Sequence, residues 1–159
     1  MKTIILGLGN SLLGDDAIGL ILVEKLSEQI KHPDLDFKTS EKVGLNLIEL
    51  VQDYDRAIII DSIITGNHPP GTVLEFSLDD LPDNPRLRCP HDADFKSAII
   101  LARKTGLKMP EEIIILGIEV IDNLTFTQDL SPELSALFPL LFQNLCSKIH
   151  NHLFCKSLS

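Results

Sequence analysis

The beginning of the chain contains the feature that most constrains its fold. A short apolar run at residues 3–6 leads into closely spaced glycines and an acid pair, namely Gly7, Gly9, Gly14, Asp15, Asp16 and Gly19. An apolar, partly β-branched run that ends at a glycine is typical of a strand buried on both faces. Apolar residues then recur every four positions over residues 18–30, which predicts an amphipathic helix. The chain therefore begins with a strand, a glycine-rich turn and a helix.

The glycine-rich turn does not fit a nucleotide site. The dinucleotide fingerprint needs a third glycine three residues after Gly9, so that the helix packs closely on the strand while the pyrophosphate rests on the helix N-terminus. Leu12 occupies that position. Asp15 and Asp16 would also repel a phosphate at the start of the helix. The turn is therefore predicted to serve a metal ion, and a nucleotide-binding oxidoreductase is disfavoured.

The rest of the chain alternates between strand-like and helix-like segments. Further strands are expected at residues 35–39, 57–60, 72–76 and 113–119. Helices are expected at residues 45–51, at 92–105 and, after a Ser131-Pro132 cap and with a break or kink at Pro139, as far as Leu153. This alternation predicts an α/β fold with a doubly wound, mostly parallel sheet and helices on both faces. The segment 72–76 is expected to be an antiparallel edge strand.

Composition and charge limit the classes of partner. The 159 residues are expected to form a single domain, 1–159, and a hydrophobic content of 44% disfavours disorder. A net charge of -9 argues against a nucleic acid or an anionic membrane as partner. No apolar run approaches membrane-spanning length, and the scattered Cys89, Cys146 and Cys155 form no disulfide framework. We therefore expect a cytoplasmic protein.

Three distant residues are expected to meet at one edge of this sheet. Asp16 follows the first strand, Asp61 ends the strand at 57–60, and His91 precedes a helix. Two carboxylates and an imidazole suit a divalent transition ion such as nickel or zinc. Each residue alone is as readily explained as a helix cap or a turn residue. Because one cap needs only one acid, we assign Asp15 to a capping or orienting role and Asp16 to the metal.

The same residues carry a family resemblance. The glycine-rich stretch with its acid pair, the Ile60-Asp61 end of a buried strand and His91 before a helix together resemble the hydrogenase maturation endopeptidases. The resemblance implies an endopeptidase that removes the C-terminal extension of a nickel-iron hydrogenase large-subunit precursor after nickel insertion. It implies that Asp16, Asp61 and His91 are both the catalytic residues and the ligands of Ni²⁺, which the precursor supplies. It also implies a monomer.

The sequence departs from this family at a few positions. Some members have glutamate at the position of Asp16. Ser62 stands where alanine is common, and Val120 stands where many members have proline; neither is expected to touch the three proposed ligands. Two other functions remain open at this stage. One is a nickel-binding maturation factor without enzymatic activity, and the other is a phosphoacceptor receiver-like domain.

Overall fold

A five-stranded sheet forms the centre of the protein. The computed structural model describes residues 1–42, 44–80 and 95–155, and its strands lie in the order β2-β1-β3-β5-β4. The strands are β1 (Thr3–Leu8), β2 (Leu35–Ser40), β3 (Arg56–Ile63), β4 (Val73–Ser77) and β5 (Glu112–Glu119). All neighbouring pairs are parallel except β4 with β5. The mostly parallel sheet and its antiparallel edge strand are thus confirmed.

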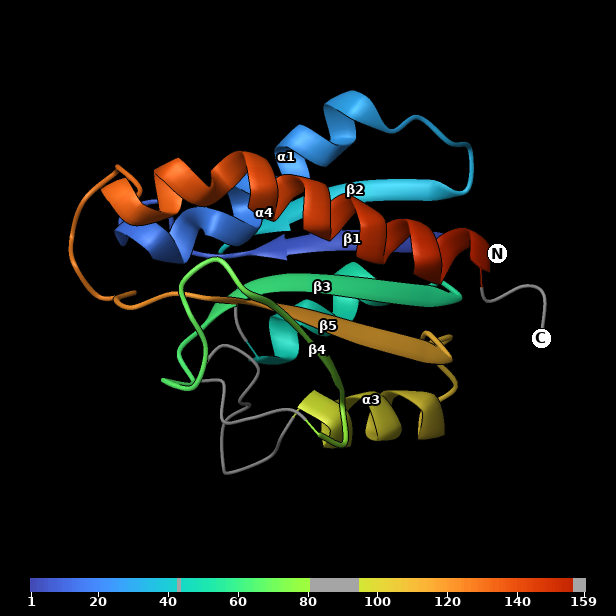
Figure 1. Ribbon diagram of the computed structural model, residues 1–159. Helices are drawn as coiled ribbons and strands as arrows, with labels where there is room; N and C mark the ends of the chain where they lie inside the picture. The colour runs from blue at the N-terminus through green and yellow to red at the C-terminus, as the bar shows by residue number, and fades with distance from the viewer. Residues whose placement is uncertain (43, 81–94, 156–159) are drawn as a thin grey trace.

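Helices cover both faces of this sheet (Figure 1). They are α1 (Ile18–Gln29), α2 (Ile48–Val51), α3 (Phe95–Lys104) and α4 (Pro132–His150), with short 3-10 turns at Gly14–Ala17 and Gly44–Leu47. The first three residues of the expected 92–105 helix lie outside the described residues. In the described part of the chain, no helix combines the length and the apolar character needed to cross a bilayer.

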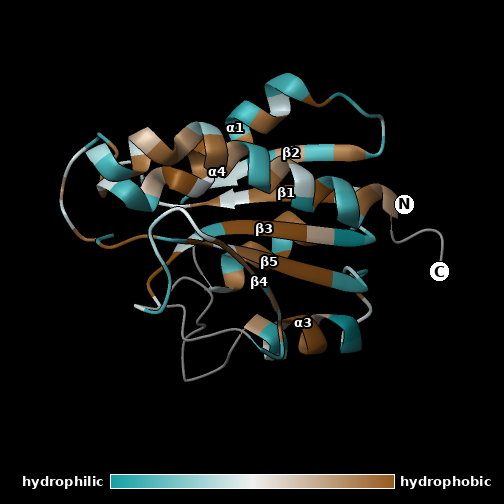
Figure 2. Ribbon diagram, in the orientation of Figure 1, coloured by the Kyte–Doolittle hydropathy of each residue, from teal (hydrophilic) through white to brown (hydrophobic). Residues whose placement is uncertain are grey.

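Alternate residues of the central strands belong to two separate hydrophobic cores, one on each face of the sheet. In β3, Ile58 and Ile60 pack with α1 and α4, whereas Ala57 and Ile59 pack with α2 and α3. This alternation follows from the two-residue repeat of a strand. Figure 2 shows hydrophobic residues along β3, the central strand of the sheet, and along its neighbour β5. Their continuous apolar sequences are what a strand covered on both faces requires.

Glycines allow α1 to lie directly against the strands. A Cβ on Gly19 would lie 2.3 Å from the carbonyl oxygen of Leu8 and 2.5 Å from that of Ile60, and a Cβ on Gly7 would lie 2.3 Å from the carbonyl oxygen of Gly19. No side chain fits at these contacts. Gly19 therefore provides the close helix–strand packing that the dinucleotide fingerprint assigns to its third glycine, but it does so ten residues after Gly9.

One expected strand end is wrong, and one expected helix break is absent. The strand expected at 57–60 continues to Ile63, because β3 stays paired with β5 through Ser62 and Ile118 after its pairing with β1 has ended at Ile60. Helix α4 is unbroken across Pro139, which excludes the break, one of the two effects expected of that proline. Pro139 is exposed, so the backbone carbonyl that loses its hydrogen bond can turn to water, while the apolar face of α4 holds the helix on the sheet.

Candidate functional site

The carboxyl edge of the sheet between β1 and β3 is the point at which the strand order reverses. Because β1 lies between β2 and β3, the chain leaves β1 toward one side of the sheet and enters β3 on the other side. In open α/β sheets, ligands bind outside the carboxyl ends of the strands at such a point. The turn after β1 and the last residues of β3 therefore line the expected binding region.

Asp16 lies in the first part of this region. It belongs to the 3-10 turn Gly14–Ala17, which joins β1 to α1, and only 2% of its surface is exposed. Gly14 has a φ of 57°, a left-handed conformation that favours glycine. A Cβ on Gly9 would lie 2.4 Å from the carbonyl oxygen of Asp16, so glycine also allows the turn to fold back onto the end of β1. These glycines place the Asp16 carboxylate inside the protein.

Asp61 and Ser62 follow the last residue of β3 that pairs with β1, and Ser62 lies next to Asp16. Asp61 is 1% exposed and Ser62 is 5% exposed. The Ser62 backbone N–H donates to Asp61 Oδ1 over 2.8 Å, and the Ser62 hydroxyl donates to Asp16 Oδ1 over 2.6 Å. One residue thus contacts both acids, through its backbone and through its side chain. The expectation that Ser62 does not touch the proposed ligands is wrong.

The third proposed ligand, His91, lies outside the described residues. Within residues 1–42, 44–80 and 95–155, no three histidine, cysteine, aspartate or glutamate side chains come close enough together to hold a metal ion. The described part of the chain therefore contributes Asp16 and Asp61 to the proposed ligand set.

Asp15 has a different role from its neighbour. Of the capping or orienting role expected for it, capping is excluded, because neither the 3-10 turn nor α1 has a side-chain cap. Asp15 Oδ1 instead accepts a hydrogen bond of 2.7 Å from the backbone N–H of Ser131. Ser131 is the N-cap of α4, and its hydroxyl accepts from Leu134 N. Asp15 therefore fixes the start of α4 against the glycine-rich turn.

A further buried acid, Glu119, ends β5 at the same edge. It is 2% exposed, and its carboxylate accepts hydrogen bonds from the backbone N–H of Thr65, over 2.8 Å, and from the Thr65 hydroxyl. Burial by itself would raise the pKa of Glu119. The hydrogen bonds from Thr65 and from the backbone N–H groups of His68 and Gly66 outweigh burial and hold that pKa below its ordinary value. Glu119 thus organises the loop that follows β3.

Comparison with known proteins connects this arrangement to one family. The family model described as hydrogenase maturation protease matches residues 21–148, which is more than half of the chain. The chain belongs to this family. It is therefore an endopeptidase that acts in hydrogenase maturation, which favours the enzyme over the carrier and receiver alternatives.

Individual relatives agree with this assignment. The hydrogenase 2 maturation protease of Escherichia coli K12 is 28% identical over 150 residues, which cover 92% of this chain and 90% of that protein. The hydrogenase expression/formation protein HupM of Azotobacter chroococcum is 30% identical over 119 residues, which cover 73% of this chain and 56% of that protein.

Solved structures show the same fold. The E. coli hydrogenase maturating endopeptidase HybD superposes with a TM-score of 0.71 at 24% identity, covering 96% of this chain and 94% of that chain. The NiFe hydrogenase maturation protease HybD from Thermococcus kodakarensis gives a TM-score of 0.60 at 25% identity, covering 94% of this chain and 99% of that chain. The doubly wound α/β fold expected from the sequence is thus confirmed.

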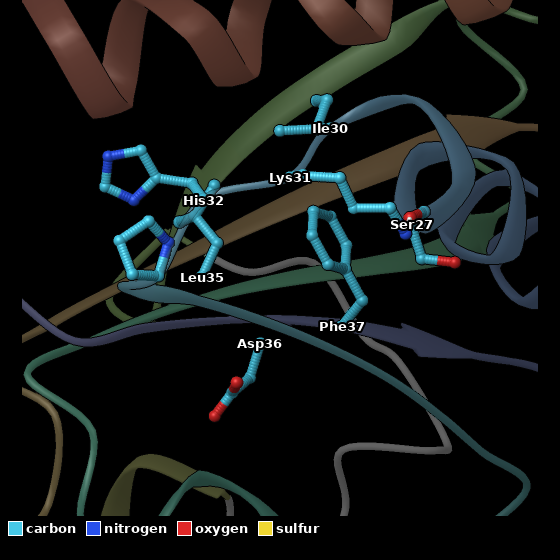
Figure 3. A pocket seen from close by; sticks show the side chains of 8 residues that line it. Ser27, Ile30, Lys31, His32, Leu35, Asp36 and Phe37 are labelled. Atoms are coloured by element: carbon cyan, nitrogen blue, oxygen red, sulfur yellow. Dashed lines mark hydrogen bonds between the residues drawn. The ribbon is translucent and has the colours of Figure 1, made fainter.

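A hollow elsewhere on the protease is not part of this site. It has a volume of about 590 Å³ and lies between the end of α1 and the beginning of β2. Leu35 and Phe37 point to one side of β2 and Asp36 to the other (Figure 3). Lys31 Nζ donates to the backbone carbonyl of Ser27 over 2.5 Å. This hollow lies near the amino end of β2, whereas the buried acids lie at the carboxyl edge.

Proposed function

We propose that this protease removes the C-terminal extension of a nickel-iron hydrogenase large-subunit precursor after nickel has been inserted. In this proposal the precursor's nickel ion binds Asp16, Asp61 and His91. Support for the client comes from the names of relatives, which include a hydrogenase 2 maturation protease and a NiFe hydrogenase maturation protease. The observation that carries the proposed site is that Asp16 and Asp61 are both buried and both accept a hydrogen bond from Ser62, at the point where the strand order reverses.

Burial gives these carboxylates a physical reason to bind a cation. Removing an ionised carboxylate from water costs several kcal/mol unless a charge or hydrogen bonds compensate for it. The hydrogen bonds from Ser62 supply part of that compensation. A divalent ion would add to it, and carboxylate oxygen together with imidazole nitrogen suits nickel. Because the ion arrives with the precursor, only a metallated precursor would complete the site, and cleavage would follow correct nickel insertion.

The proposal predicts that cleavage depends on nickel in the precursor. Purified protease mixed with nickel-loaded large-subunit precursor should shorten that precursor, as measured by intact mass, whereas nickel-free precursor should keep its mass. Efficient cleavage of the nickel-free precursor would contradict nickel recognition. Nickel transfer without any change of precursor mass would identify a carrier instead.

The site assignment is tested by Asp16→Ala, Asp61→Ala and His91→Ala, each of which should abolish trimming while the protein stays folded by circular dichroism. Asp34→Ala is a suitable control, because Asp34 is exposed and lies before β2, near the N-terminus. That control should trim at the rate of the unchanged protein. Normal trimming by all three site variants would overturn the assignment.

We further propose that the protease is a cytoplasmic monomer that folds as a single domain. Both faces of the sheet are already covered by helices of the same chain. Light scattering after size exclusion should therefore give a mass near 17.6 kDa. A mass of twice that value would contradict the monomer.

A further inference from the structure

Ser62 lies between the two proposed ligands that the structure describes. We propose that it is a positioning residue, whose hydroxyl orients the Asp16 carboxylate for the metallated precursor. This inference rests on the function proposed above. The contact spans 46 positions in the sequence and joins the end of β3 to the turn before α1.

Strand geometry explains how Ser62 reaches Asp16. Ser62 has the same parity along β3 as Ile58 and Ile60, which pack with α1 and α4. Its side chain therefore projects from the sheet on the side where the turn before α1 lies, and the donor–acceptor distance of 2.6 Å is typical of a hydroxyl that donates to an ionised carboxylate. Such a bond restricts the rotation of the short aspartate side chain.

The two hydrogen bonds of Ser62 can be separated by mutation. The bond to Asp61 uses the backbone N–H, which every residue except proline keeps. The bond to Asp16 uses the hydroxyl, which Ser62→Ala removes. Ser62→Ala therefore removes this hydrogen bond to Asp16 and leaves the contact of Asp61 in place. The substitution removes a single buried oxygen atom, so it tests orientation with little change in packing.

The geometry also predicts a compensating exchange. Asp16→Glu adds one methylene and moves the carboxylate toward the position of the Ser62 hydroxyl, so the single variant should be crowded. Ser62→Ala vacates that position. The double variant Asp16→Glu/Ser62→Ala has the same number of side-chain heavy atoms as the original pair. Its glutamate fills the space that the Ser62 hydroxyl leaves, and the surrounding atoms restrict its rotation. The two substitutions should therefore be strongly non-additive.

Single-turnover trimming of nickel-loaded precursor provides the test, with trimming efficiency defined as the rate constant divided by the half-saturating precursor concentration. We expect Ser62→Ala to lower this efficiency about tenfold or more, in the range seen when one positioning contact is lost. Ser62→Thr keeps the hydroxyl and should retain most of the efficiency. The double variant should exceed both Ser62→Ala and Asp16→Glu.

Tyr54→Phe is a matched control. It also removes a hydroxyl that donates to an aspartate carboxylate over 2.6 Å, in this case to Asp36 at the amino edge of the sheet. Its trimming efficiency should equal that of the unchanged protein. If Ser62→Ala destabilises the fold, Ser62→Cys fills the position with a slightly larger thiol, which is a weaker donor, and should also lose efficiency.

The possible outcomes separate this inference from the proposed function. Full efficiency of Ser62→Ala or Ser62→Cys, together with an inactive Asp16→Ala, would overturn the role of Ser62 and leave the proposed function intact. The same holds if losses in the double variant are simply additive. An active Asp16→Ala would overturn the site and this inference together, and so would the absence of trimming by the unchanged protein.

Discussion

Individual buried acids at the carboxyl edge have distinct partners. The carboxylate of Asp16 accepts from a side-chain hydroxyl, that of Asp61 from the next backbone N–H, and that of Asp15 from the backbone N–H of Ser131, the N-cap of a distant helix. Each bond removes part of the cost of burying charge. The acids differ in what they hold: Asp15 and Glu119 hold protein segments, whereas Asp16 and Asp61 lie where the proposed metal would bind.

Glu119 gives a pH-dependent prediction at this scale. Burial raises the folded-state pKa of Glu119, but the hydrogen-bond donors around Thr65 lower it by more, so the net shift is downward. The contribution of Glu119 to stability is therefore present above the ordinary value of 4.5 and is lost as pH falls through the folded pKa. Glu119→Gln should therefore lower the free energy of unfolding by about 2 kcal/mol at neutral pH. The difference should shrink below pH 4.5 in urea titrations.

The exposed Glu28 on α1 is the control. Glu28→Gln should change stability little at either pH, because its side chain is already solvated. A constant difference between Glu119→Gln and the unchanged protein across the acid range would contradict the role of the charge.

Helix α1 is the element whose position determines where Asp16 lies. Gly19→Ala would bring a Cβ within 2.3 Å of the Leu8 carbonyl oxygen, which is backbone and cannot yield easily. We expect a loss of about 3 kcal/mol in the free energy of unfolding, at the upper end of overpacking effects. Because α1 and its preceding turn must shift, trimming at a temperature where the variant is folded should also fall.

Gly66→Ala is the matched control for a glycine with room around it. Among residues 1–42, 44–80 and 95–155, no atom lies within 4 Å of the position of its Cβ, and its φ of 73° places the cost of the substitution in backbone strain. That cost should be about 1 kcal/mol. Equal destabilisation by the two substitutions, measured by thermal unfolding, would argue against close packing as the role of Gly19.

In the whole molecule, the proposed site and a major stabilising contact lie at opposite edges of the sheet. Arg56 begins β3, where its Nε contacts Glu112 Oε2 over 2.6 Å and its Nη1 donates to the His152 carbonyl over 2.9 Å. His152 itself is buried and pairs with Glu75 over 3.0 Å. Arg56 thus ties the C-terminal turn to the amino edge.

This separation predicts a loss of stability without a loss of chemistry. Arg56→Met should lower the free energy of unfolding by about 2 kcal/mol, because it leaves Glu112 and the His152 carbonyl without the guanidinium. Trimming by the folded variant should remain normal. Lys108→Met breaks an exposed pair with Asp55 and should have a much smaller effect on stability. A trimming defect in fully folded Arg56→Met would show that the two edges are coupled.

Local patterns were sufficient to predict much of this molecule. Continuous apolar runs mark β1, β3 and β5, a four-residue repeat marks α1, and glycines mark the turn that bears Asp16, because hydrophobic period and backbone freedom are properties of neighbouring residues. Element ends were predicted less well. Whether β3 stops at Ile60 or continues to Ile63 depends on its pairing with β5, more than 50 positions away.

The sequence by itself determined the order of strands and helices and, through its motif, the acids that lie at the carboxyl edge. Only the tertiary structure decided what those acids contact. Asp15 meets Ser131 and Asp16 meets Ser62 across 116 and 46 positions. Such contacts depend on strand register and on how closely α1 approaches the sheet. A shift of one residue in β3 would turn Ser62 to the opposite face, and no local pattern around Ser62 encodes that register.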